Sequence, residues 1–158
     1  MQKIELIILQ SEEKYRQEYL KTYVSANFYL IDIPVIFSAQ DFDHIFFEPS
    51  KEGTEYIFSP RRAKRMYFIK AILSEKLNIE MMYEPDRETI ALFCLDLECV
   101  MYLRIRPGTG SLQVGTFFDF GRDHTKMYLK QKKKCVPITL QEIKKNLILK
   151  AVSLGPTA

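Results

Sequence analysis

Cysteine and histidine are scarce in this chain, and their arrangement argues against a metal site. The three cysteines, Cys94, Cys99 and Cys135, form an odd set whose spacing matches no disulfide or zinc framework. The only histidines are His44 and His124. We therefore expect no metal, no cofactor and three free thiols in a reducing compartment.

Long hydrophobic runs and the common catalytic signatures are also missing. No apolar stretch approaches the length of about 20 residues that a membrane-spanning helix needs. The N-terminus lacks the basic segment and apolar run of a secretory signal, so we expect a cytoplasmic protein without a membrane partner. The patterns GxxxxGK(S/T), GxGxxG, GxSxG and HExxH are absent. A metal-dependent nuclease is disfavoured too, because Val100 stands where its lysine would follow Glu98.

The residues that are present are sufficient for one folded domain. Of the 158 residues, 47% are hydrophobic, and no repeat or linker divides them. We expect a single domain, 1–158, of the α+β class, with helices packed on one face of a curved antiparallel β-meander. Its parts are an N-terminal helical and strand region (1–77), the meander (78–120), and a basic segment with a C-terminal helix (121–154).

The meander is predicted from residues that alternate with period two in the runs 89–94, 99–106 and 112–118. Turns at 96–97 and 107–110 join these runs.

This register places Leu103 opposite Val114 and Met101 opposite Thr116. The core face of the last strand then carries Leu112, Val114, Thr116 and Phe118. The opposite face carries Tyr102, Arg104, Arg106 and Gln113 towards one end, and Phe93, Val100 and Phe117 towards the other.

Two helix starts are marked by local signals. Ser59 followed by Pro60 is typical of a helix N-terminus, and the predicted helix runs to about Lys76. Thr139 and Glu142 have the spacing of a capping box and predict the start of the C-terminal helix.

Basic residues gather at 61–65, 104–106 and 122–134, although the net charge is only +3. Such clusters indicate a polyanionic partner, while the competing interpretation is a solvated basic face. The residues expected to bind nucleic acid are Arg106, Arg122, Lys126 and Lys130.

Cleavage of RNA by its own 2′-hydroxyl needs a base, an acid and cations that stabilise the phosphorane. His124, directly after the last predicted strand, is a candidate base or acid. Arg104 and Arg122 are candidates for stabilising the negative charge on the phosphate, and Tyr102 could orient a hydroxyl or stack a base. A histidine in a polar loop is more often a surface residue, so that alternative stays open.

At two positions in the N-terminal half, a purely structural role competes with a role in the site. His44 lies in a short helix rich in phenylalanine, where a packing role is common. Arg62 is typical of a structural ion pair, with Glu48 or Glu55 as the acidic partner.

Two local patterns and one layout carry a family resemblance. The step Phe42-Asp43-His44-Ile45 precedes a helix of the form FSxxRAxRMxFI from Phe58 to Ile69, and a meander ending in a basic segment follows. Over residues 35–135 this resembles the small ribonuclease superfamily of barnase, EndoU, the tRNA-cleaving colicins and RelE, in its phage and mobile-element branch. The resemblance implies helices on one side of the sheet and active residues on the other. The positions it implicates are His44, Arg62, Tyr102, Arg104 and His124.

We therefore predict a metal-independent endoribonuclease that acts by acid–base phosphoester transfer, as a toxin or phage-borne effector. The expected partner is RNA, with tRNA and mRNA as candidates, and an antitoxin or inhibitor protein is a further candidate. No acidic base is evident on the basic face unless Glu98 or Asp119 serves.

The alternative is a non-catalytic accessory protein of a phage or mobile element that binds a host protein or nucleic acid. It is motivated by aromatic residues that could form an exposed patch, namely Tyr15, Tyr19, Tyr23, Phe46 and Phe47. The helical spacing of the three tyrosines is also typical of packing.

Overall fold

The computed structural model describes residues 4–153 and shows an α+β fold, as expected. The α-helices are α1 (Glu12–Tyr19), α2 (Asp41–Phe46), α3 (Pro60–Ala63), α4 (Met66–Leu73), α5 (His124–Lys132) and α6 (Leu140–Ser153), and a π-helical segment (Leu20–Val24) continues α1. The strands are β1 (Phe28–Leu30), β2 (Ile33–Val35), β3 (Phe47–Pro49), β4 (Tyr56–Phe58), β5 (Ile79–Glu84), β6 (Thr89–Cys94), β7 (Cys99–Arg106), β8 (Ser111–Asp119) and β9 (Val136–Pro137).

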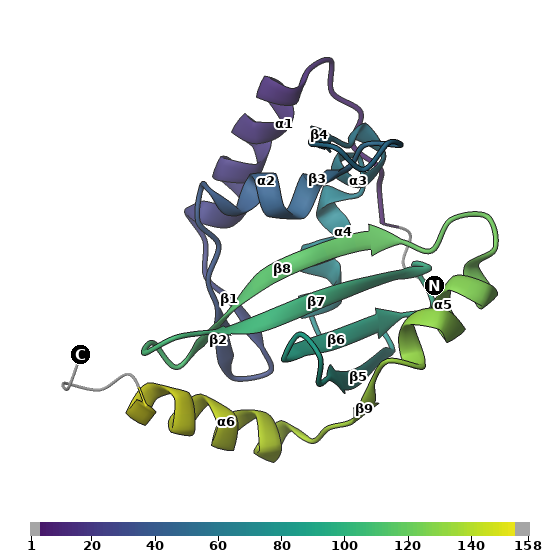
Figure 1. The fold of residues 1–158 in the computed structure, drawn as a ribbon. Helices are drawn as coiled ribbons and strands as arrows, with labels where there is room; N and C mark the ends of the chain where they lie inside the picture. Colours follow the sequence, from purple (N-terminus) through teal and green to yellow (C-terminus); the bar gives the residue numbers. More distant parts are fainter. Residues whose placement is uncertain (1–3, 154–158) are drawn as a thin grey trace.

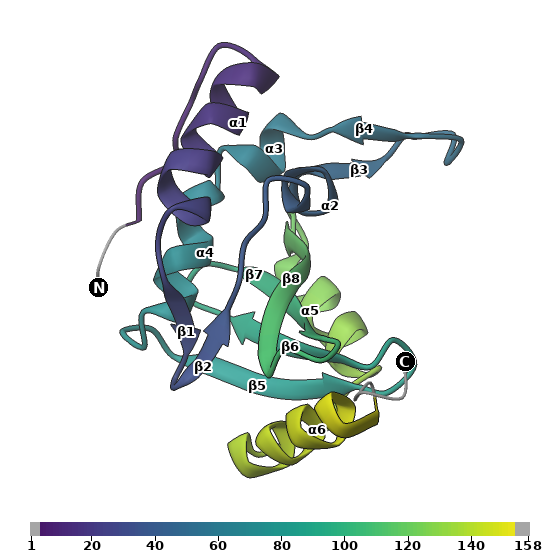
Figure 2. The same cartoon turned by 90° about the vertical axis from the view of Figure 1, so that its left-hand side faces the viewer.

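A curled sheet of seven strands, in the order β1-β2-β8-β7-β6-β5-β9, forms the centre of the molecule (Figure 1). The meander from β5 to β8 is antiparallel, as predicted. Among the described strands, only β2 joins in parallel, through Val35 opposite Leu112. A separate two-stranded hairpin, β3–β4, stands outside this sheet and projects from the body (Figure 2).

The predicted register holds at the turns and fails in the middle of β8. Leu103 lies opposite Val114, as expected, but Met101 lies opposite Phe117 and not opposite Thr116. The reason is a β-bulge that leaves Gly115 without a partner on β7. An extra residue in one strand reverses the faces of every side chain beyond it.

The bulge therefore corrects the predicted faces of β8. Phe117 is fully buried in the main core, whereas Phe118 packs against the other face. Thr116 is paired with Tyr102 and lies on that second face as well. Thr116 and Phe118 thus move from the expected core side to the side that carries Arg104.

The main core lies between the sheet and the N-terminal helices. Tyr15, Tyr19 and Tyr23 point inward and are 4%, 0% and 0% exposed, and Phe46 is 0% exposed. Their packing role is confirmed. The exposed aromatic patch suggested for the binding-protein alternative is wrong, since of its five members only Phe47 is even half-exposed.

The predicted helix from Ser59 is interrupted after one turn. Ser59 caps it as expected, because its hydroxyl accepts from the backbone N–H of Arg62. The carbonyl of Lys64, however, accepts from the N–H of Ile7, at 2.8 Å. The N–H of Phe68 bonds to the Arg65 carbonyl at 2.9 Å and not to that of Lys64, so the chain turns here and restarts as α4.

The second face of the sheet is covered over one half by α5. The Tyr128 hydroxyl donates to Glu80 at 2.6 Å, and the Lys132 ammonium lies 3.0 Å from the same carboxylate. The ring of Tyr128 also meets Phe93 edge-on. Helices consequently pack on both faces, and the uncovered half of the second face is open to form a pocket.

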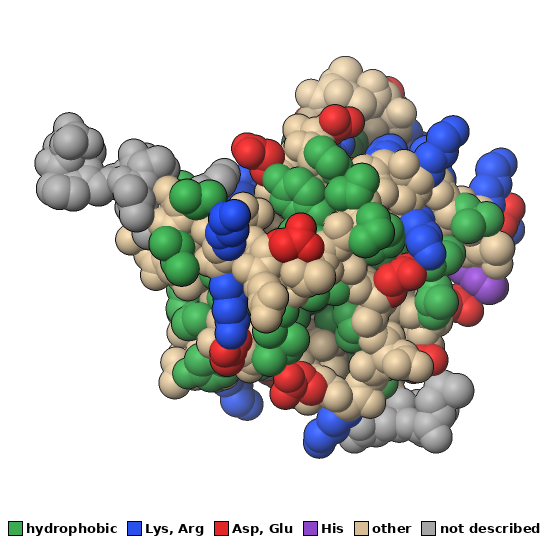
Figure 3. Space-filling view, turned by 90° about the horizontal axis from the view of Figure 1, so that it is seen from below, with side chains coloured by type: hydrophobic (Ala, Val, Ile, Leu, Met, Phe, Trp, Pro, Cys, Tyr) green, Lys and Arg blue, Asp and Glu red, His purple; other side chains and the backbone are tan. Residues whose placement is uncertain are grey.

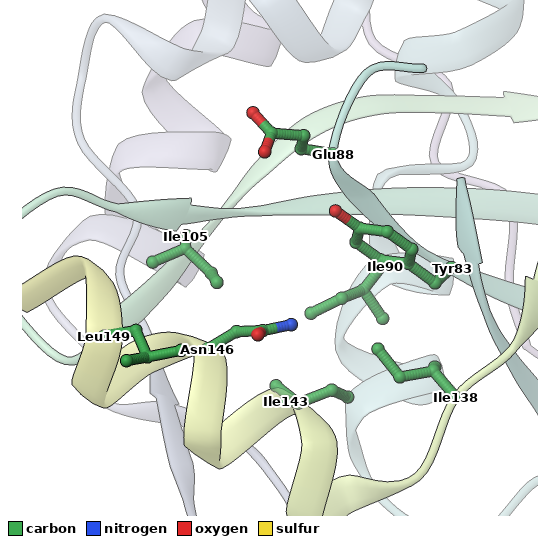
Figure 4. A pocket seen from close by; sticks show the side chains of 8 residues that line it. All are labelled: Tyr83, Glu88, Ile90, Ile105, Ile138, Ile143, Asn146 and Leu149. Atoms are coloured by element: carbon green, nitrogen blue, oxygen red, sulfur yellow. The ribbon is translucent and has the colours of Figure 1, made fainter. Parts of the chain in front are cut away.

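The C-terminal helix α6 begins with the predicted capping box. The Thr139 N–H donates to Glu142, and the Glu142 N–H donates back to the Thr139 hydroxyl. Ile143 and Leu147 are buried, and a hollow of about 200 Å³ remains between the helix and the sheet (Figure 4). Seen from below, this side mixes hydrophobic side chains with charges of both signs (Figure 3). The expected helix end at residue 154 lies outside the described residues.

Within residues 4–153, no helix combines the length and the apolar character that crossing a membrane requires.

Replacing Phe117 and Phe118 in turn tests the bulge. Phe117→Ala removes a fully buried ring, so we expect a loss of about 3–5 kcal/mol in the free energy of unfolding. Phe118→Ala removes a half-buried ring and should cost less than half as much. Urea unfolding of both variants measures the difference. A larger loss in the free energy of unfolding for Phe118→Ala would contradict the bulge and support the register predicted without it.

Candidate functional site

A pocket of about 840 Å³ opens over the uncovered half of the second sheet face. Its floor is formed by β5, β7 and β8, one wall by α2 and the β3–β4 hairpin, and another by the end of α5. Figure 2 shows the hairpin and α5 on the same side of β8. The pocket thus collects side chains from both halves of the chain.

Four of the five residues implicated by the family resemblance line this pocket. They are His44, Arg62, Tyr102 and Arg104. The fifth, His124, is not among the lining residues. Their convergence depends on the fold, because α2 packs on β8 and thereby brings His44 to the strands that carry Tyr102 and Arg104.

Arg104 lines the pocket with a guanidinium that has no partner among the described residues. Its guanidinium makes no hydrogen bond or ion pair with the part of the chain that the structure describes. It lies flat against Gly115 of the neighbouring strand, where an added Cβ would come within 3.2 Å of Nε and Nη2. The bulge glycine therefore creates the space that Arg104 occupies.

Tyr102 is held in place as a hydrogen-bond donor. Its hydroxyl donates to Gln131 of α5 at 2.9 Å, and its ring stacks on Phe118 with centroids 6.2 Å apart. Burial raises the pKa of Tyr102 above its ordinary value of 10.0. The hydroxyl consequently stays protonated and links α5 to the pocket floor.

Arg62 supports the wall of the pocket, and most of its guanidinium is occupied by contacts with the protein. Its side chain is 14% exposed, and Nη1 donates to the Phe47 carbonyl at 2.7 Å. Its Nε lies 3.5 Å from the Glu48 carboxylate, which confirms the expected ion pair with Glu48. The same Nε has no hydrogen-bond partner among the described residues. Burial lowers the pKa of Arg62, although the residue remains a cation. Arg62 thus fixes the start of the hairpin and adds positive charge beside the pocket.

An acidic residue, Glu84, was missed by sequence reasoning. It ends β5, is 4% exposed, and accepts a hydrogen bond from the Thr89 hydroxyl at 3.3 Å. The Nε of Arg87 lies 3.8 Å from the same carboxylate. Sequence analysis did not single out Glu84, although the alternation Glu80, Met82, Glu84 carries the signal that places it on the second face.

A smaller recess of about 280 Å³ adjoins the pocket floor. It is lined by Glu84, Arg87, Thr89, Tyr102, Arg104 and Thr116, with Gly115 beneath. A buried carboxylate, a free guanidinium and three hydroxyl-bearing side chains therefore share one small space.

His44 faces the pocket from the α2 wall. Its side chain is exposed and makes no hydrogen bond or ion pair with other described residues, while its neighbour Asp43 is bonded to Arg16 at 2.9 Å. The phenylalanines of α2 face the core, so the packing role considered for His44 falls to Phe42 and Phe46. His44 is free to contact a ligand.

His124 lies at another part of the sheet. It begins α5, is half-exposed, and its Nε2 lies 3.7 Å from Glu98. Glu98 precedes Arg104 by six positions, which corresponds to about 20 Å along a strand. The side chain of Asp119, the other acidic candidate, is bound by Arg61.

The residues expected to bind nucleic acid also lie outside the pocket. Arg122, Lys126 and Lys130 are exposed on α5 or its approach, and Arg106 is half-exposed at the end of β7. The pocket has its own excess of positive charge instead, because Arg62, Arg87, Arg104 and Lys134 face only two acidic side chains, Asp43 and Glu84. An anionic ligand fits this balance.

No three His, Cys, Asp or Glu side chains among residues 4–149 come together in a way that could hold a metal ion. Comparison with known proteins finds no matching family model and no significant match among curated proteins or solved structures. The superfamily resemblance therefore stays a prediction, and the geometry of the pocket carries the functional argument.

Substituting Gly115 tests how Arg104 is positioned. Because the backbone of Gly115 is not in the left-handed region, Gly115→Ala should fold, but its methyl group displaces the guanidinium. We expect binding of a fluorescent single-stranded oligonucleotide, followed by anisotropy, to weaken about tenfold, as for loss of one charge-assisted contact.

The control is a double-mutant cycle with Arg104→Ala. If Gly115 acts through Arg104, adding Gly115→Ala to Arg104→Ala should change the affinity little further. Additive losses would contradict this explanation.

Proposed function

We propose that the protein is a metal-independent endoribonuclease that cleaves RNA by acid–base phosphoester transfer. The observation that carries the proposal is one pocket in which a buried carboxylate, an uncommitted guanidinium and a free histidine converge, in Glu84, Arg104 and His44. This set supplies a base, a cation and an acid, the three groups that attack by a 2′-hydroxyl needs.

The order of the elements supports these roles. In-line attack places the entering and leaving oxygens on opposite sides of phosphorus, so base and acid must come from opposite directions. Glu84 lies on β5, Arg104 on β7, and His44 on α2 beyond β8. The guanidinium therefore stands between the two proton-transfer groups, where the phosphorane charge develops.

The proposed reaction needs no co-reactant, because one proton is taken from the 2′-hydroxyl and one is given to the leaving oxygen. Glu84 takes the proton of the 2′-hydroxyl as that oxygen attacks phosphorus, and Arg104 stabilises the charge on the phosphoryl oxygens. The bond from phosphorus to the 5′-oxygen then breaks, and protonated His44 gives its proton to that oxygen. The products are a 2′,3′-cyclic phosphate and a free 5′-hydroxyl.

The role of base belongs to Glu84 rather than to Tyr102. The Tyr102 hydroxyl is kept protonated by burial and is already bonded to Gln131. A protonated phenol can donate to a phosphoryl oxygen or hold α5 in place, but it cannot accept a proton. Among the described residues, the Thr89 hydroxyl is the one hydrogen-bond donor to Glu84, and the Arg87 guanidinium lies 3.8 Å away. The carboxylate therefore keeps acceptor capacity towards the recess.

Cleavage in the absence of divalent metal tests the reaction class. Purified protein should degrade single-stranded RNA in excess EDTA and release 2′,3′-cyclic phosphate ends, because every proposed catalytic group belongs to the chain. Replacing 2′-hydroxyls by 2′-O-methyl groups should abolish cleavage. Salt-sensitive RNA binding without any cleavage would favour the non-catalytic alternative.

Substitutions in the pocket test the assignment of roles. His44→Ala, Glu84→Gln and Arg104→Ala should each lower kcat/KM by about 10²-fold or more, the usual size of acid–base and charge-stabilising contributions. Single-turnover cleavage of an end-labelled RNA measures the rates.

The matched comparison is between the two histidines. His124→Ala removes an exposed histidine paired with Glu98, away from the pocket, and should keep a rate close to wild type. A large loss for His124→Ala with none for His44→Ala would return the catalytic role to His124.

A further inference from the structure

The β3–β4 hairpin presents one aromatic ring to the pocket without needing it for the fold. Its register pairs Phe47 with Phe58 and Pro49 with Tyr56, so these four side chains share one face. Phe47 and Phe58 pack against the core, whereas Tyr56 is 72% exposed. Tyr56 makes no hydrogen bond or ring contact with other described residues, yet it lines the pocket.

We infer that Tyr56 stacks an unpaired nucleobase next to the scissile phosphate and so restricts the substrate to single-stranded RNA. This inference rests on the proposed function. Scattered exposed aromatic residues are common on proteins and by themselves indicate nothing. The position of Tyr56 is what decides, because its ring stands on the wall of a pocket that also holds Arg104 and Arg62.

A nucleotide offers both groups that such a pocket recognises. Its phosphate suits the guanidinium of Arg104, and its base has a flat π-face that stacks on tyrosine. A phosphate without a neighbouring ring would use only half of the site. The exposed Pro49 opposite Tyr56 extends the apolar surface on which a base can rest.

The same geometry excludes a duplex. In a double helix each base is covered on both faces by its neighbours, so Tyr56 can reach only a base that has left the stack. A-form geometry also holds the 2′-hydroxyl out of line with the bond that must break. A single strand meets both requirements without the cost of unstacking.

Kinetics of Tyr56 variants on matched RNAs test the inference. Tyr56→Ala should raise KM for single-stranded RNA about tenfold or more, as expected for loss of one stacked base, and should leave kcat within about twofold. Tyr56→Phe keeps the ring and should behave as wild type. The wild type should cleave the single strand at least about tenfold more efficiently than the same sequence in a blunt duplex.

The chain offers a closely matched control in Tyr29. This residue is 48% exposed and lies opposite Pro34 in the β1–β2 hairpin, as Tyr56 lies opposite Pro49, but it does not line the pocket. Tyr29→Ala should leave KM unchanged. Equal effects of both alanine variants, a KM for Tyr56→Ala equal to wild type, or equal cleavage of the duplex would overturn the inference.

Binding of a non-cleavable ligand separates this inference from the proposed function. If wild-type protein cleaves no RNA, the proposed function fails, but anisotropy with a fluorescent 2′-O-methyl oligonucleotide still measures stacking. Weaker binding by Tyr56→Ala and normal binding by Tyr56→Phe would support the role of the ring. Unchanged binding by Tyr56→Ala, or equally weakened binding by both variants, would contradict it.

Discussion

The unpaired glycine of β8 is the constraint on which the pocket depends. Because Gly115 has no partner on β7, the strand changes faces at this point, and Thr116 and Phe118 join Tyr102 on the second face. The absence of a side chain at Gly115 also leaves the space in which the Arg104 guanidinium lies. One residue therefore sets both which side chains reach the pocket and how its free cation is oriented.

Buried aromatic residues hold the other half of the pocket. The hydroxyl of Tyr19 donates to the Ser38 carbonyl at 2.7 Å, and its ring meets Phe42 and Phe46 of α2 edge-on. These contacts fix the helix that carries His44. Arg62 continues the support by binding the Phe47 carbonyl, where α2 passes into the hairpin. The aromatic content that first suggested an exposed recognition patch serves instead to position the wall of the pocket.

The sequence was a good guide to the sheet and a partial guide to the site. Period-two alternation predicted the meander and most of its register, because burial of one face leaves a clear pattern. It failed at Gly115, since the residues that follow, Thr116 to Phe118, can face either side. Glu84 was missed because strand ends are uncertain by a residue or more. His124 was favoured because it follows the last predicted strand, but where α5 carries it depends on contacts such as Tyr128 with Glu80 that no local pattern reveals.

The single parallel pair between β2 and β8 affects the order of assembly. The meander is built from neighbouring strands, and such local contacts form early in folding. Val35 meets Leu112 only after the long intervening segment has closed, which is entropically costly. The proposed site draws His44 from one side of this long-range contact and Glu84 and Arg104 from the meander, so its completeness depends on tertiary closure and not on the meander alone.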